Sequence, residues 1–124
     1  MPIHNDIVVK RVFDAVQMAP NGTSRSDAVD LGDFAQVGNF SLQLEIRGTG
    51  TTIDVTYELS NDKQTFLTPL GAGGIVYNFW TGSGPGKDGN DIIVFDCSFA
   101  RYMQVKIVEI GGGGPTITAL LAVQ

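Results

Sequence analysis

The sequence predicts an all-β fold, a jelly-roll-like β-sandwich of about eight antiparallel strands in a single domain over residues 1–124. Glycine makes up 16 of the 124 residues, close to twice its usual share of about 7%. Charged residues make up 17% of the chain, below the usual ~25%. No long stretch keeps the apolar spacing of an amphipathic helix, whereas short alternating runs recur between glycine-rich turns.

Two segments show strict alternation and predict half-buried strands. The even positions are apolar in residues 40–47, and the odd positions are apolar in residues 53–59. The short segment 48–51 between them predicts a β-hairpin. We expect Arg47 to lie opposite Asp54, because this register keeps like charges from facing each other across the strand pair.

Shorter apolar runs predict the other strands, and Gly, Pro, Asn and Asp mark the turns between them. The expected strands are residues 7–18, 29–31, 65–68, 75–81, 92–95, 100–110 and 116–123. In the last of these, Leu120 and Ala122 make the second face apolar as well. This pattern indicates a strand that is covered on both sides or lies in an interface between subunits.

Histidine and cysteine each occur once, at His4 and Cys97. Nucleophilic hydrolysis by a Ser-His-Asp or Cys-His arrangement needs an imidazole held beside the nucleophile, and His4 lies in a terminus that is expected to fray. The neighbouring Asp96 disfavours a reactive thiolate, so Cys97 is interpreted as a small buried residue. The sequence therefore predicts a protein that is not an enzyme.

The charge distribution disfavours several partners. The net charge is −5, and the eight basic residues are scattered, so no nucleic-acid interface is expected. No apolar run approaches the ~20 residues of a membrane-spanning helix, so no membrane partner is expected. The N-terminus lacks a signal-peptide pattern, which predicts synthesis in the cytosol.

Two sets of oxygen-bearing side chains are candidate sites. Glu45, Asp54 and Glu58 could gather as paired carboxylates for glycoside hydrolysis, but the polar face of a strand pair explains their spacing better.

Asp88 and Asn90, at the end of the glycine-rich stretch 82–90, and the following Asp91 faintly resemble a calcium loop. The closing Glu of such a loop is missing. A turn is therefore the favoured interpretation, and calcium is the alternative.

Three aromatic residues, Tyr77, Phe79 and Trp80, precede the 82–90 loop. An exposed Trp80 could stack on a sugar ring, as in sandwich-type sugar-binding modules. Because Tyr77 and Phe79 alternate with Val76, Asn78 and Trp80, at least one of the aromatic residues must face a core. A place in the core or in a subunit interface is favoured, and glycan binding is the alternative.

The closing segments 99–107 and 117–123 are similar to the last strands of discoidin-like, galactose-binding-like sandwiches. In that family an Ala-Arg-Tyr-x-Arg-Ile type strand precedes a final apolar strand. Here Ala100, Arg101 and Tyr102 match, whereas Gln104 stands where the pattern often has a second basic residue. The resemblance implies a carbohydrate-binding, lectin-like module.

A broader set of short segments resembles small β-sandwich proteins encoded in phage and prophage structural-gene clusters. These segments are residues 26–32, 41–44, 57–62, 100–103 and 121–124. The resemblance implies a non-enzymatic capsid decoration or accessory protein, located in the virion, whose partner is a major capsid or tail protein.

A decoration protein needs surfaces that dock on its shell and on its own copies. The expected partner-binding residues are Pro2, Ile3, His4, Trp80, Lys87 and Leu120. The doubly apolar strand that holds Leu120 predicts a homo-oligomer, with a trimer favoured.

Overall fold

The computed structural model describes residues 7–31, 39–48, 52–69, 76–80, 90–96 and 100–123. These residues form nine strands and no helix. The strands are β1 (Val8–Gln17), β2 (Thr23–Arg25), β3 (Val29–Asp30), β4 (Asn39–Arg47), β5 (Thr52–Ser60), β6 (Val76–Trp80), β7 (Asn90–Asp96), β8 (Tyr102–Glu109) and β9 (Thr116–Val123).

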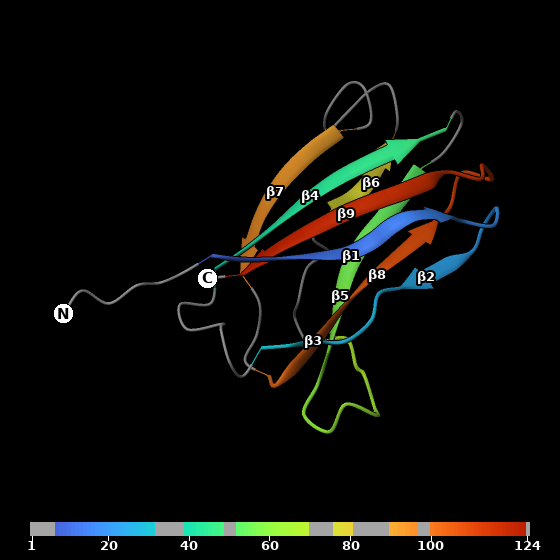
Figure 1. Cartoon of the computed structure of the whole chain (residues 1–124). Coiled ribbons are helices and arrows are strands. Elements are labelled where there is room, and N and C mark those ends of the chain that lie inside the picture. Colours follow the sequence, from blue (N-terminus) through green and yellow to red (C-terminus); the bar gives the residue numbers. More distant parts are fainter. Residues whose placement is uncertain are drawn as a thin grey trace.

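The strands form two sheets, which lie as two layers (Figure 1). Sheet A has the order β1-β9-β4-β7, and sheet B has the order β2-β8-β5-β6, with β3 also paired to β8. Every strand pair is antiparallel. The all-β sandwich predicted from the sequence is confirmed.

The connectivity is that of a jelly roll. The first half of the chain pairs with the second half in reverse order, as β1 with β9, β2 and β3 with β8, β4 with β7, and β5 with β6. These four antiparallel pairs wrap around one core, and the chain passes repeatedly from one sheet to the other. The first and last strands consequently both belong to sheet A, where β1 and β9 lie side by side.

The predicted hairpin of residues 40–47 and 53–59 is wrong, because β4 and β5 belong to different sheets. Arg47 lies opposite Thr116, and Asp54 lies opposite Val108, so the expected Arg47–Asp54 register is also wrong. Strands that face each other across a core show the same apolar alternation as neighbours in one sheet, so alternation does not separate the two arrangements.

Gly48 marks the point where the chain leaves β4 for the other layer. Its φ of 143° lies in a region that favours glycine. A Cβ at this position would also lie 3.2 Å from Cα of Pro115. The glycine therefore belongs to a crossing between sheets, not to the tight turn of a hairpin.

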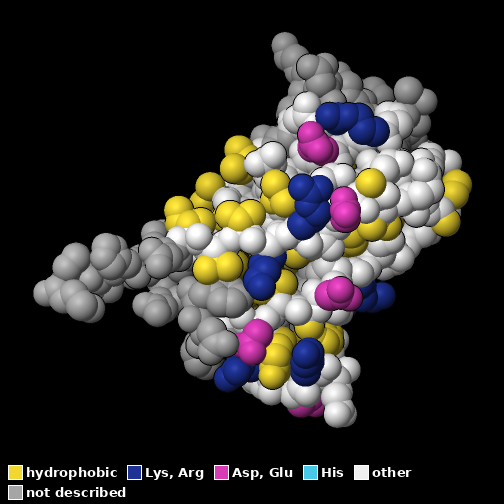
Figure 2. All heavy atoms as spheres, viewed as in Figure 1, with side chains coloured by type: hydrophobic (Ala, Val, Ile, Leu, Met, Phe, Trp, Pro, Cys, Tyr) yellow, Lys and Arg dark blue, Asp and Glu magenta, His cyan; other side chains and the backbone are white. Residues whose placement is uncertain are grey.

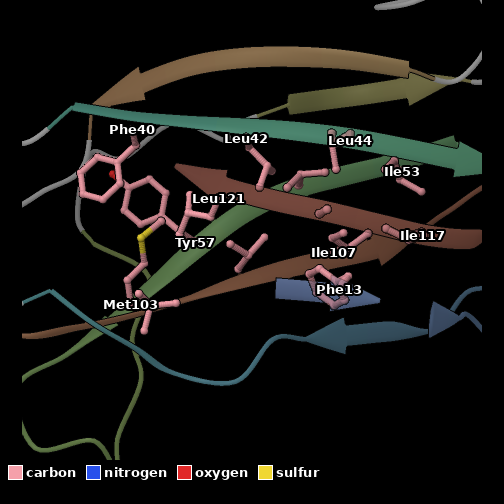
Figure 3. Close-up of a cluster of buried hydrophobic side chains, with 14 of the residues drawn as sticks. Phe13, Phe40, Leu42, Leu44, Ile53, Tyr57, Met103, Ile107, Ile117 and Leu121 are labelled. Carbon is pink, nitrogen blue, oxygen red and sulfur yellow. The ribbon is translucent and has the colours of Figure 1, made fainter. Parts of the chain in front are cut away.

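The core lies between the sheets and is built from the inward positions of both (Figure 3). Leu42, Leu44 and Leu121 of sheet A and Val55 and Ile107 of sheet B are fully buried. At one end, the Phe95 ring of sheet A stacks on Phe40 and on Tyr57 of sheet B, with ring centroids 5.4 and 5.9 Å apart.

Most other predicted strands are present, with two differences. Residues 65–68 provide only a single bridge, in which Leu67 pairs with Leu59. Residues Thr23–Arg25 form β2, which the sequence did not predict because three polar residues carry no apolar alternation.

Candidate functional site

The outer face of sheet A carries two adjacent cross-strand rows with an unusual content of aliphatic side chains. The first row, from β1 to β7, is Val9, Ala122, Ser41 and Val94. The second row is Arg11, Leu120, Gln43 and Ile92. We call the five aliphatic residues of these rows, Val9, Ile92, Val94, Leu120 and Ala122, the apolar patch.

The apolar patch is open to solvent. Val94 is 77% exposed, Ile92 61% and Val9 58%, while Leu120 and Ala122 are half-buried between them. Figure 2 shows hydrophobic side chains gathered over this part of sheet A. Single exposed aliphatic residues are ordinary, whereas five aliphatic residues within two adjacent rows of one sheet face mark an interaction surface.

The same face turns polar toward the other end of its strands. There Arg47 donates a hydrogen bond from Nη1 to Oδ1 of Asn90 at 2.9 Å, and its Nη2 lies 3.6 Å from Oε1 of Glu45. On the neighbouring β9, Thr116 lies opposite Arg47 and Thr118 lies opposite Glu45. The aliphatic character is therefore confined to the end of the face where β1 begins and β9 ends.

The outer face of sheet B has the opposite character, with Glu58 as its centre. The Glu58 carboxylate accepts hydrogen bonds from Nε of Arg25 at 2.8 Å and from Nε2 of Gln104 at 2.7 Å. Burial acts to raise the pKa of Glu58, but these two hydrogen bonds and the charges of Arg25 and Lys106 outweigh it, so the pKa lies below its ordinary value. A carboxylate held in this way is a structural ion-pair member.

The three carboxylates considered for glycoside hydrolysis do not gather. Glu45 lies on the outer face of sheet A, whereas Asp54 and Glu58 lie on the outer face of sheet B. The core separates Glu45 from the other two, so the three cannot act on one substrate.

Glu109 is a functional-looking carboxylate that the sequence analysis did not single out. Its side chain is buried and accepts four backbone N–H groups, those of Asn21 and Gly112 on Oε1 and those of Thr52 and Gly111 on Oε2. It thus joins three connections of the fold at one end of the sandwich. The sequence does give a signal for this residue, because Glu109 occupies an inward position of β8, in step with the buried apolar residues of that strand.

A pocket of about 470 Å³ lies at the opposite end of β5. It is lined by Leu59, Ser60, Asn61, Asp62, Thr65, Leu67, Pro69 and Ala100. Asp62 shapes its rim by accepting the N–H groups of Gln64 and Thr65, both at 2.9 Å, and the Ser60 hydroxyl at 2.7 Å. The N–H groups of Thr65 and Gln64 and the Ser60 hydroxyl lower the pKa of Asp62 to about 2.

We expect Asp62→Asn to destabilise the protein at neutral pH but not at pH 2. The folded pKa of Asp62 lies below its ordinary value of 3.8, so its ionised form stabilises the fold above about pH 4. This contribution is lost as the pH falls toward 2. Thermal unfolding of the variant and the parent from pH 7 to pH 2 measures it.

The matched control for Asp62→Asn is Asp14→Asn, which removes an exposed carboxylate paired with Arg11 at 3.3 Å. We expect a smaller loss of Tm from it, because exposed ion pairs contribute little. A Tm difference between parent and Asp62→Asn that stays constant over the whole pH range would contradict the role assigned to the ionised Asp62.

The structure places some of the predicted partner-binding residues and leaves others outside the described part of the chain. Leu120 lies in the apolar patch. Trp80 is the last residue of β6, but its side chain is not among those that the structure describes. Pro2, Ile3, His4 and Lys87 are also outside the described residues.

The calcium hypothesis falls largely outside the described residues as well. Asp88 and the side chain of Asp91 are not described, and the Asn90 amide oxygen accepts a hydrogen bond from Arg47. Among the residues that the structure describes, no group of three or more His, Cys, Asp and Glu side chains could hold a metal ion.

The described segments also contain no helix long and apolar enough to cross a membrane. No protein-family model matches the chain, and no curated protein matches its sequence.

Proposed function

We propose that the chain is a non-enzymatic virion structural protein, a capsid decoration or accessory protein that binds a repeated viral shell. The observation that carries the proposal is the contrast between its two outer faces. On sheet B the charged groups are used in internal contacts such as Arg25–Glu58, whereas sheet A exposes aliphatic side chains. Such a molecule is suited to contact between proteins, not to chemistry on a small substrate.

Three further observations support the proposal. Among the described residues, every buried side-chain nitrogen or oxygen has a hydrogen-bond partner, so none of them is left to receive a substrate. Jelly rolls are a recurrent architecture of viral capsid proteins, which is an argument by analogy of fold. The short segments that resemble phage sandwich proteins include the ends of β5 and β9, which build the core.

Co-sedimentation tests the proposal. Purified heads and tails of the phage that encodes the chain, lacking the protein, are mixed with increasing amounts of it. We expect saturable binding at a fixed number of copies per capsid or tail subunit, because a lattice repeats one contact many times. A protein that remains in the supernatant with both heads and tails would overturn the proposal.

A second candidate is a carbohydrate-binding module, which the pocket beside β5 favours. Its rim combines side-chain oxygens of Asn61 and Thr65 with the exposed aliphatic Leu67, a mixture suited to a sugar ring. Titration with a panel of monosaccharides, followed by amide NMR shifts, tests this function. Shifts at Asn61 and Thr65 would favour the module over the virion role, and unchanged spectra would exclude it.

A further inference from the structure

We infer that the outer face of sheet A packs against the same face of a second copy, which forms a two-fold symmetric dimer centred on the apolar patch. The inference goes beyond the proposed function and does not depend on it, because it requires only the placement of β1, β9, β4 and β7. It gives the exposed side chains of Val94 and Ile92 a contact surface in the second copy.

The size of the face argues for an occupant as large as a sheet. Four strands at ~4.8 Å spacing, each about eight residues long at ~3.4 Å per residue, give a face of roughly 19 by 27 Å. The corresponding ~500 Å² of flat area, increased by side-chain relief, approaches the ~800 Å² per partner of a standard protein interface. A single added strand or a sugar ring would cover only part of the two rows.

A second copy of the chain meets this requirement. Two sheets pack face to face about 10 Å apart, with their strands about 30° from parallel and the side chains of the two faces interlocking. A two-fold axis in the interface plane and along the strands places β1 over β7 of the second copy. Val9 then meets Val94, and Leu120 meets Gln43, each from opposite copies.

The centre of the face holds no charged residue that such packing would bury without a partner. Between the aliphatic side chains lie Ser41 and Gln43, which are uncharged and which this arrangement places against Ala122 and Leu120 of the second copy. Arg11 lies on edge strand β1, so its aliphatic stem can cover Ile92 of the second copy while its guanidinium stays at the rim. Desolvation of charge therefore does not oppose the contact.

The net charge of the chain distinguishes an apolar interface from one built on ion pairs. Each chain carries a formal charge of −5, so two copies repel one another at low ionic strength. Salt screens this repulsion and leaves the apolar contact intact. We therefore expect the dimer to strengthen between about 20 and 500 mM NaCl, whereas an interface built on ion pairs would weaken over the same range.

Sedimentation equilibrium of the full chain at loading concentrations from about 1 to 200 μM tests the inference. We expect a concentration-dependent species of twice the 13.2 kDa chain mass. Val94→Asp should weaken dimerisation at least about tenfold, because the charge enters the interface once from each copy. Val94→Thr keeps the β-branched shape and should weaken it less, in the same direction.

The matched control is Thr23→Asp, which places the same charge on an exposed position of β2 in sheet B. It should leave the dissociation constant within about twofold of the parent. Circular dichroism and Tm establish that each variant is folded. If Val94→Asp does not fold, Val94→Thr provides the comparison.

Each other result overturns the inference. A monomer at 200 μM in 500 mM NaCl, a trimer, or a dimer that Val94→Asp leaves unchanged would each be incompatible with the two-fold face. A monomer whose binding to purified heads is lost in Val94→Asp would assign the apolar patch to the shell and keep the proposed function. A dimer that depends on Val94 but binds neither heads nor tails would overturn the proposed function and would support the inference.

Discussion

Glu109→Gln is expected to lower Tm by on the order of 10 °C or more, one of the two largest effects among the substitutions proposed for this chain. The Glu109 side chain is 1% exposed and is surrounded by four backbone N–H groups. Glutamine has nearly the same shape, so the change isolates hydrogen bonding from packing. Thermal unfolding followed by circular dichroism measures the shift.

The expected loss of stability follows from the change in hydrogen-bond donors and acceptors. The carboxylate accepts two N–H groups on each oxygen, from Asn21 and Gly112 on one and from Thr52 and Gly111 on the other. Glutamine keeps one oxygen and turns an NH₂ group, itself a donor, toward two N–H donors. Two lost hydrogen bonds to a charged acceptor cost roughly 3–6 kcal/mol.

The loss should be local as well as global. Amide hydrogen exchange of Thr52, Gly111 and Gly112 should accelerate in Glu109→Gln, since these groups lose their acceptor or its charge. Glu45→Gln makes the same chemical change at an exposed position of β4 and should alter stability by less than about 0.5 kcal/mol. Equal stability of the two variants would contradict the role assigned to Glu109.

The phase of alternation is the part of this fold that the sequence predicts best. The inward positions of β4, β5 and β9, such as Leu42, Val55 and Leu121, are buried as expected. The partners of β4 were not predictable in the same way. A strand with one apolar face can bury that face in either sheet. The chain crosses between the layers at Gly48, and β4 and β5 therefore lie in opposite sheets.

In the candidate site, too, some residues could be predicted from the sequence and others could not. Leu120 was selected because β9 is apolar on both faces, and this residue lies in the apolar patch. Ile92 and Val94 lie in a run that is apolar at every position, so alternation could not tell which side chains of β7 face outward. Their exposure follows from the pairing of β7 with β4, which is a long-range contact.

Tyr57→Ala is expected to destabilise the protein by roughly 3–5 kcal/mol, the cost of truncating a large buried aromatic side chain. Tyr57 is 5% exposed and extends from sheet B to the Phe95 ring of sheet A, which also stacks on Phe40. Its removal leaves a cavity between the layers and takes one ring from a stack of three. Urea-induced unfolding followed by circular dichroism measures the change in free energy.

Tyr57→Phe is the matched control, because it keeps the ring and removes only the hydroxyl. We expect it to cost about 1 kcal/mol or less, since a typical hydrogen bond contributes about that much. The comparison also tests the corrected topology. If β4 and β5 were neighbours in one sheet, Phe40 and Tyr57 would both project from that sheet, and the Phe95 ring of β7 would have no partner from an opposing layer. A Tyr57→Ala variant as stable as Tyr57→Phe would therefore contradict the packing of the two sheets at this end of the core.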